Sequence, residues 1–314
     1  MRPHPYYQAV IDAYRAVNRP FFHQVSPQEA REMLLAGVAA APAPTDLPDL
    51  AAVEDRAIDG PHGPIPLRIY TPRDAAGCLV YFHSGGWVIG NRDTADATCR
   101  RLAGLAGCTL VSVEYRKAPE HPFPEPLDDA FAAVEWAATA FPSALLVGGE
   151  SAGGNLAAAC AIRARDRGGP AIAGQWLAYP VTDHDFATLS YREVGERNWL
   201  LSTADMRWFW DQYCPNEELR HQADASPLRV ARAAGLPPAM IVVAQLDPLR
   251  DEGLAYGARL AREGVQVVTR CDPDMVHGYL GAAGAIAAAA EALAESARWM
   301  RARLDLSGCS GAAA

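Results

Sequence analysis

One serine in the chain lies between two glycines in a pattern typical of a catalytic nucleophile. An apolar run over 145–147 leads into Gly149-Glu150-Ser151-Ala152-Gly153, and an alanine-rich, helix-forming run follows at once. This order predicts a strand, a very sharp turn with Ser151 at its tip, and a helix. Small residues are needed there because the two backbones approach closely. The unpaired N–H groups at the start of the helix would then lie beside the serine oxygen.

The same segment has two other interpretations. The five-residue pattern occurs by chance in on the order of one chain in ten of this length. A glycine-rich turn between a strand and a helix can also bind a dinucleotide, but Glu150 stands where that loop requires its second glycine. The nucleophile interpretation therefore depends on finding a base, an acid and an oxyanion hole elsewhere in the chain.

His277 is the histidine best placed to act as the base. It follows the last predicted strand and precedes the closing helix, in Asp274-Met275-Val276-His277-Gly278-Tyr279. That position is the carboxyl edge of an open α/β sheet, where active sites form. Five other histidines have no chemical context and are expected at the surface: His4, His23, His62, His184 and His221.

Asp247 is the favoured acid, because it ends the apolar run 239–246 and so also lies at the carboxyl end of a strand. Asp251 is its rival, although we expect it in the first turn of the next helix, where a carboxylate suits the helix dipole. Two further aspartates are less favoured because they lie close to the histidine in the sequence: Asp272 and Asp274. The order Ser151, Asp247, His277 is the one expected for a nucleophile-elbow hydrolase.

An oxyanion hole is predicted after the strand at 78–82, which ends in His83-Ser84-Gly85-Gly86-Trp87. Glycines let the backbone turn so that N–H groups point at one spot, about 3 Å from the developing oxyanion. Gly85, Gly86 and the residue after the nucleophile, Ala152, would supply the donors. The alternative is a plain glycine loop at the end of a strand.

Composition limits the class of protein. The chain has 314 residues, of which 50% are hydrophobic and 21% charged, as in a globular domain with one large core. A net charge of −9 without a basic block argues against nucleic acid and anionic membranes as partners. The seven cysteines form no C-x-x-C pair, which suits a reducing compartment. With no apolar signal peptide or membrane-length segment, we expect a cytoplasmic protein.

Strands and helices alternate along most of the chain. A hairpin over 53–70 is followed by apolar strands separated by helices of about 10 to 15 residues, the last strand at 265–269 and the closing helix at 281–304. This alternation predicts an α/β fold with a mostly parallel sheet of about eight strands, covered on both faces by helices.

The segment between Asp183 and Pro227 interrupts this alternation. It has no strand signal and carries Trp199, Trp208 and Trp210, which suggests an inserted helical lid. The alternative is a helix packed on the core with its aromatic side chains buried. The expected division is N-terminal cap helices over 1–45, a catalytic core over 46–184 and 227–306, an inserted cap segment over 185–226, and a disordered tail over 307–314.

Five segments form a larger set of motifs. They are His83-Ser84-Gly85-Gly86-Trp87, the run 115–124 that contains Ala118-Pro119-Glu120-His121-Pro122, the elbow with its extension through Ala157, Asp247-Pro248-Leu249-Arg250-Asp251-Glu252-Gly253, and His277-Gly278-Tyr279. Over roughly residues 45 to 300 the chain resembles the bacterial hormone-sensitive-lipase-like (family IV) esterases, a branch of the α/β-hydrolase fold. The resemblance implies a cap built from the N-terminal helices and the inserted segment, and Asp247 rather than Asp251 as the acid.

Two positions depart from the pattern of that family. Ser84 replaces the first glycine of the usual His-Gly-Gly-Gly, and Glu150 replaces the aspartate that usually precedes the nucleophile. Gly85 and Gly86 are retained, so we expect the oxyanion hole to survive.

These residues predict a serine carboxylesterase that hydrolyses short- to medium-chain acyl esters through an acyl-enzyme, without metal or cofactor. We expect four bulky side chains to line its pocket: Trp87, Trp208, Phe209 and Leu249. A lactonase, deacetylase or amidase would use the same residues, because pocket shape selects the leaving group. A non-catalytic small-molecule receptor on the same scaffold is the remote alternative. The sequence leaves the oligomeric state open, a homodimer included.

Overall fold

A sheet of eight strands organises the part of the chain that the computed structural model describes, residues 2–41, 43–197 and 199–310. The strands lie in the order β1-β2-β4-β3-β5-β6-β7-β8. β1 and β2 form an antiparallel hairpin, β2 is antiparallel to β4, and the other neighbours are parallel. The bounds are β1 Ala52–Ile58, β2 Ile65–Thr71, β3 Cys78–Phe82, β4 Thr109–Val113, β5 Leu145–Glu150, β6 Gly174–Ala178, β7 Ala239–Leu246 and β8 Val267–Val276.

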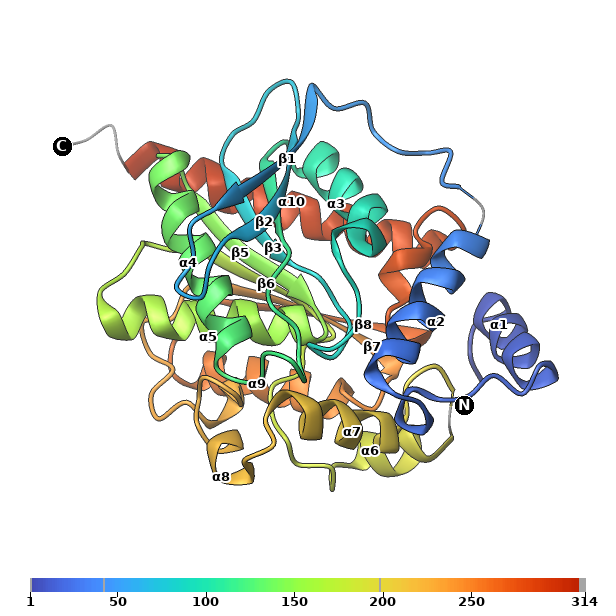
Figure 1. Cartoon of the computed structure of the whole chain (residues 1–314). Helices are drawn as coiled ribbons and strands as arrows, with labels where there is room; N and C mark the ends of the chain where they lie inside the picture. The colour runs from blue at the N-terminus through green and yellow to red at the C-terminus, as the bar shows by residue number, and fades with distance from the viewer. Residues whose placement is uncertain (1, 42, 198, 311–314) are drawn as a thin grey trace.

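Helices cover both faces of the sheet (Figure 1). α3 (Arg92–Ala106) and α10 (Ala287–Ser310) pack on one face, where Leu79 of β3 and Leu146 of β5 point. α4 (Glu125–Ala140), α5 (Ala152–Arg167) and α9 (Arg250–Arg262) pack on the other, which receives Val80 and Val147. Strands buried on both faces must be apolar throughout, which is why these strands read as continuous hydrophobic runs. The predicted α/β fold and its mostly parallel sheet are confirmed.

Some element bounds differ from the predictions. β8 runs to Val276 rather than ending at residue 269, because an edge strand tolerates the polar residues Arg270 and Asp272 that interrupt its apolar pattern. The closing helix begins at Ala287 rather than near residue 281, after a 3₁₀ turn, Tyr279–Ala282. α10 continues through 307–310, within the predicted tail, since extending a helix costs less than starting one. Residues 311–314 of that tail lie outside the described part.

Helices also occupy the two segments for which a cap is predicted. The first has α1 (Pro5–Ala16), a 3₁₀ turn Phe22–Gln24 and α2 (Pro27–Ala40). The second has α6 (Leu189–Glu193), a turn Gly195–Arg197, α7 (Thr203–Tyr213) and α8 (Glu217–Arg220), with a further turn at Pro227–Arg229.

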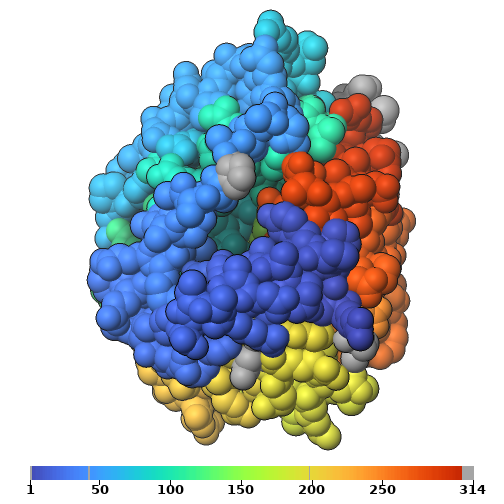
Figure 2. All heavy atoms as spheres, turned by 90° about the vertical axis from the view of Figure 1, so that its right-hand side faces the viewer, coloured from blue at the N-terminus to red at the C-terminus, as the bar shows by residue number. Residues whose placement is uncertain are grey.

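The two segments meet (Figure 2). The ring of Phe22 lies 5.8 Å from that of Phe209 in α7, and Nδ1 of His23 lies 2.8 Å from a carboxylate oxygen of Asp205. Figure 2 shows the N-terminal residues spread over this face, which is hollowed between them and the red C-terminal part. Within the described part of the chain, every helix is too short or too polar to span a lipid bilayer.

Candidate active site

The turn around Ser151 has the tight geometry that its neighbours suggest. β5 ends at Glu150, α5 starts at Ala152, and Ser151 between them has φ 57° and ψ −119°, a region that non-glycine residues seldom occupy. A Cβ on Gly153 would lie 1.9 Å from the carbonyl oxygen of Phe82. Only glycine therefore fits there, and the close approach of α5 to β3 fixes the serine at the carboxyl edge of the sheet.

Three side chains that are distant in the sequence meet at this edge. Nε2 of His277 lies 2.9 Å from Oγ of Ser151, 126 residues away. Nδ1 of the same ring lies 2.7 Å from Oδ2 of Asp247. Asp247 is fully buried directly after β7, and its other oxygen accepts the N–H of Leu249 at 2.9 Å. The hydroxyl, imidazole and carboxylate thus form one continuous hydrogen-bonded chain.

The rival aspartates have other partners. Asp251 accepts the backbone N–H of Ser190 at 2.7 Å and pairs with Arg250, so it links α9 to the inserted segment. Asp272 pairs with Arg270 and accepts the hydroxyl of Tyr279. Among the described residues, Asp247 is the one aspartate in contact with the imidazole of His277.

The glycine loop after β3 presents free N–H groups. Gly85 and Gly86 have φ of 125° and 56°, and a Cβ on Gly86 would lie 2.1 Å from the ring of Phe209. The carbonyl of Gly85 accepts the N–H groups of Val88 and Ile89, which closes the loop. Within the described residues, the N–H groups of Gly85, Gly86 and Ala152 have no hydrogen-bond acceptor. They are therefore available to bind a negatively charged oxygen.

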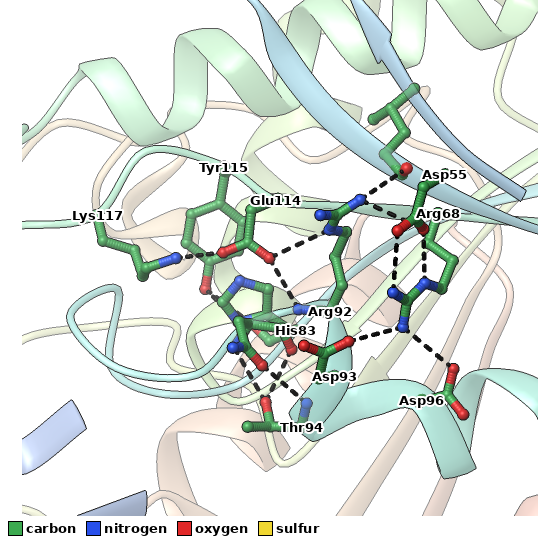
Figure 3. Close-up of polar contacts among 12 residues, drawn as sticks. Asp55, Arg68, His83, Arg92, Asp93, Thr94, Asp96, Glu114, Tyr115 and Lys117 are labelled. Carbon is green, nitrogen blue, oxygen red and sulfur yellow. Dashed lines mark hydrogen bonds and ion pairs between the residues drawn. The ribbon is translucent and has the colours of Figure 1, made fainter. Parts of the chain in front are cut away.

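His83 supports this loop from behind (Figure 3). Its Nδ1–H donates to the carbonyl of Ser84 at 2.8 Å, and its own carbonyl accepts the hydroxyl of Tyr115 at 2.9 Å. Burial lowers the pKa of His83 to about 4, so the ring is neutral at pH 7. Figure 3 shows Tyr115 beside it and, next to them, Glu114, whose carboxylate accepts from Lys117.

Ser84 fits this loop without strain. It is not among the residues with positive φ, whereas the next two positions are glycines with positive φ. A Cβ at Ser84 therefore costs no backbone strain. The loop keeps its turn because the positions that need glycine still have it.

The four predicted pocket residues differ in how far they are buried. Phe209 lies against Gly86, and the partly buried Trp208 packs edge-on against it with ring centroids 5.0 Å apart. Trp87 is fully buried, stacked on Tyr213 with centroids 4.0 Å apart. Leu249 is also fully buried. Phe209 is almost as buried, at 3% exposure, so among the four residues Trp208 alone is partly exposed. Which of them contact a ligand stays a prediction.

Tyr179 is a residue near the site that the sequence prediction missed. It directly follows β6 with φ 36°, and its ring meets that of His277 edge-on, with centroids 4.9 Å apart. Its position could have identified it, since it follows a strand at the same carboxyl edge as Ser151 and Asp247. The described residues contain no group of three or more His, Cys, Asp or Glu side chains arranged to hold a metal ion.

The chain is similar to several known proteins. The family described as having the alpha/beta hydrolase fold matches residues 79–281. Esterase LipI of Mycobacterium tuberculosis is 44% identical over 257 residues, which are 78% of this chain and 80% of that protein. An ethyl acetate hydrolase of Pseudomonas putida is 31% identical over 303 residues, 91% of this chain and 94% of that protein. The solved hyperthermophilic esterase of Pyrobaculum calidifontis has a TM-score of 0.91 and 35% identity, and covers 96% of this chain and 99% of its own.

Proposed function

Since the chain belongs to the hormone-sensitive-lipase-like branch of the carboxylic ester hydrolases with the α/β-hydrolase fold, we propose that it cleaves esters through Ser151, His277 and Asp247. The observation that carries this proposal is the hydrogen-bonded chain of the three side chains, with distances of 2.9 and 2.7 Å. A nucleophile, its base and the group that orients the base are the parts that acyl transfer requires.

The first step is the attack of Ser151 on the ester carbonyl. Nε2 of His277 accepts the hydroxyl proton as the oxygen bonds to the carbonyl carbon. Asp247 accepts the Nδ1–H of His277, which selects the tautomer with a free Nε2 lone pair and stabilises the imidazolium that forms. Full burial of Asp247 strengthens this interaction, because no water competes for the carboxylate.

The charge that develops on the carbonyl oxygen is stabilised by the N–H groups of Gly85, Gly86 and Ala152. These donors are aimed before the substrate arrives, so no reorganisation is needed during the reaction. Removing one such donor from an enzyme of this kind costs about 3–4 kcal/mol in the transition state. The N-terminus of α5 adds its positive dipole end at the same place.

The second half of the reaction releases both products. His277 returns its proton to the alcohol oxygen as the carbon–oxygen bond breaks, which leaves the acyl group on Ser151. Water then attacks this acyl-enzyme, His277 again accepts the proton, and the carboxylic acid leaves as the serine regains its hydrogen.

Short- to medium-chain acyl esters are the proposed substrates. Phe209 packs against Gly86 and the ring of Phe22 packs against Phe209, so aromatic side chains crowd the oxyanion loop. A relative that is 31% identical over most of both chains is named an ethyl acetate hydrolase, and the acyl group of ethyl acetate has two carbons.

Labelling with a fluorophosphonate probe tests the proposed chemistry. The probe phosphonylates a serine that a neighbouring base activates. We expect the wild-type protein to be labelled and to hydrolyse p-nitrophenyl butyrate, and Ser151→Ala to do neither. Ester hydrolysis that persists unchanged in Ser151→Ala would refute the assignment of the nucleophile.

A further inference from the structure

A second buried carboxylate lies beside the proposed triad. Glu150 immediately precedes the nucleophile, is 6% exposed and points into the face of the sheet that α3 and α10 cover. Tyr81 donates its hydroxyl to Oε1 at 3.0 Å, and Tyr179 donates to Oε2 at 2.6 Å. Within the described residues no lysine or arginine pairs with Glu150. Its carboxylate is therefore held by two phenols rather than by a cation.

Tyr179 connects this carboxylate to the imidazole of His277. Its ring is fully buried, and its edge meets the histidine ring at 62° with centroids 4.9 Å apart. The backbone holds the ring in place, because the N–H of Tyr179 donates to the carbonyl of Val242 at 2.5 Å and its φ is 36°. A residue stays in such a strained conformation only where the surrounding contacts hold it there, which is common at functional sites.

We propose that Glu150 is a positioning residue whose carboxylate, fixed by Tyr81 and Tyr179, supplies a second negative charge that stabilises the imidazolium of His277. This inference rests on the proposed role of His277 as the base. Glu150 touches neither Ser151 Oγ nor the imidazole, and so acts through the field of its charge and through the ring of Tyr179.

Several titratable groups lie around His277. Asp247, after β7, is hydrogen-bonded to its ring, and Tyr179, after β6, meets the ring edge-on and holds Glu150 of β5. Tyr179 also faces Tyr279, after β8, and lies near Tyr7 of α1, while Cys99 of α3 lies near Glu150. Arg270 of β8, which pairs with Asp272, is the positively charged group beside Tyr279.

The pKa of Glu150 is raised, because burial outweighs three contacts that lower it: the hydrogen bonds from Tyr179 and Tyr81 and the nearby charge of His277. By reciprocity, a carboxylate stabilised by protonated His277 must stabilise that protonated form in turn.

Glu150→Gln tests the proposal, because it keeps the shape and removes the charge. The acid limb of the pH profile of kcat/KM reports the ionisation of the base in the free enzyme. Without the nearby negative charge, protonated His277 is less stable, so we expect the acid limb to move to lower pH by about one unit. We also expect kcat at the plateau to fall about tenfold, as the imidazolium of the transition state loses support.

Two further variants separate charge from structure. Glu150→Asp retains the charge, so we expect its acid limb to stay within about 0.3 pH unit of the wild type even if its thermal stability falls. Glu135→Gln makes the same substitution at an exposed position of α4, on the opposite face of the sheet, and should leave the profile unchanged. A Glu150→Gln enzyme that folds, hydrolyses esters and keeps the wild-type acid limb overturns the proposal.

If Glu150→Gln does not fold, Tyr179→Phe and Tyr81→Phe take its place. Each removes one donor to the carboxylate and so weakens the charged form of Glu150. An acid limb that moves to lower pH in these variants supports the proposal, and one that stays in place in both overturns it. If the wild-type protein is not labelled by the fluorophosphonate probe, the proposed function itself is wrong.

Discussion

The hydroxyl of Tyr7 in α1 donates a hydrogen bond to the carbonyl oxygen of Tyr279 at 3.0 Å, across 272 residues of sequence. A second bond joins the N–H of His4 to the carbonyl of Asp274 at 2.8 Å. The two carbonyls lie on either side of His277 in the sequence. The first helix and the residue that caps it therefore bind the chain on both sides of the proposed base.

Tyr7→Phe should reduce catalysis more than it reduces binding. It removes one of the two bonds, and a typical intramolecular hydrogen bond contributes about 0.5–1.5 kcal/mol of stability. We expect kcat to fall several-fold with KM nearly unchanged, since His277 becomes less well positioned. Steady-state kinetics and thermal unfolding measure both effects. Tyr6→Phe is the control, because Tyr6 is 43% exposed; equal losses in the two variants would contradict the prediction.

The choice between Asp247 and Asp251 can be tested by removing each charge. Asp247→Asn should reduce kcat by about 10⁴-fold, because it leaves the imidazole with the wrong tautomer. Asp251→Asn should stay within about tenfold of the wild type, since its carboxylate binds Ser190 and Arg250 instead. Initial rates with p-nitrophenyl butyrate suffice for the comparison. Similar losses in both variants would show that the acid is misassigned.

Gly86→Ala should abolish most activity. The added Cβ would lie 2.1 Å from the ring of Phe209, at a backbone φ of 56°. The loop must move, and the loss of one oxyanion donor alone reduces kcat by about 10²- to 10³-fold. Gly168→Ala is a matched control, because its φ is 64° but no atom lies within 4 Å of the new Cβ. If both variants retain wild-type rates, Gly86 does not shape the oxyanion hole.

The preferred acyl chain is a further measurable expectation. Because Phe209 and Trp208 crowd the oxyanion loop, p-nitrophenyl acetate to hexanoate should be cleaved faster than longer esters. Rates across a series from acetate to palmitate give the profile, and lactones and acyl amides measured alongside compare the other leaving groups. A maximum at palmitate would rule out the crowded pocket.

Neutral His83 should make the fold sensitive to mild acid. Its pKa is about 4 in the folded protein, against 6.5 ordinarily, so the unfolded chain binds the proton more readily. Stability due to this group is therefore lost as the pH falls from 6.5 to 4, by up to about 3 kcal/mol, and is level below that. Urea unfolding of the wild type and His83→Gln across this range isolates the effect. Parallel curves for the two proteins would argue against it.

The sequence predicted the parts of the molecule that follow from local rules. The elbow around Ser151 was predictable because close backbone approach demands small residues on both sides of it. Asp247 and His277 were predictable as candidates because each follows a strand at the carboxyl edge. Their roles in catalysis remain predictions that the variants above test.

Other features depend on contacts between distant elements. Trp87 is next to the oxyanion glycines in sequence, yet its ring stacks on Tyr213 of α7, which no local pattern could indicate. The environment of Glu150 is formed by two distant tyrosines, Tyr81 of β3 and Tyr179 after β6. The start of α10 at Ala287 could not be predicted, because the alanine and glycine residues before it mark no clear helix boundary.

The contacts Phe22–Phe209 and His23–Asp205 have a consequence for engineering by recombination. In a chimaera that takes only the inserted segment from a relative, Phe22 and His23 would meet foreign partners, one of them at the position of Phe209, which packs against Gly86. The two segments should therefore be exchanged as a pair, and libraries that shuffle them independently should yield mostly inactive proteins.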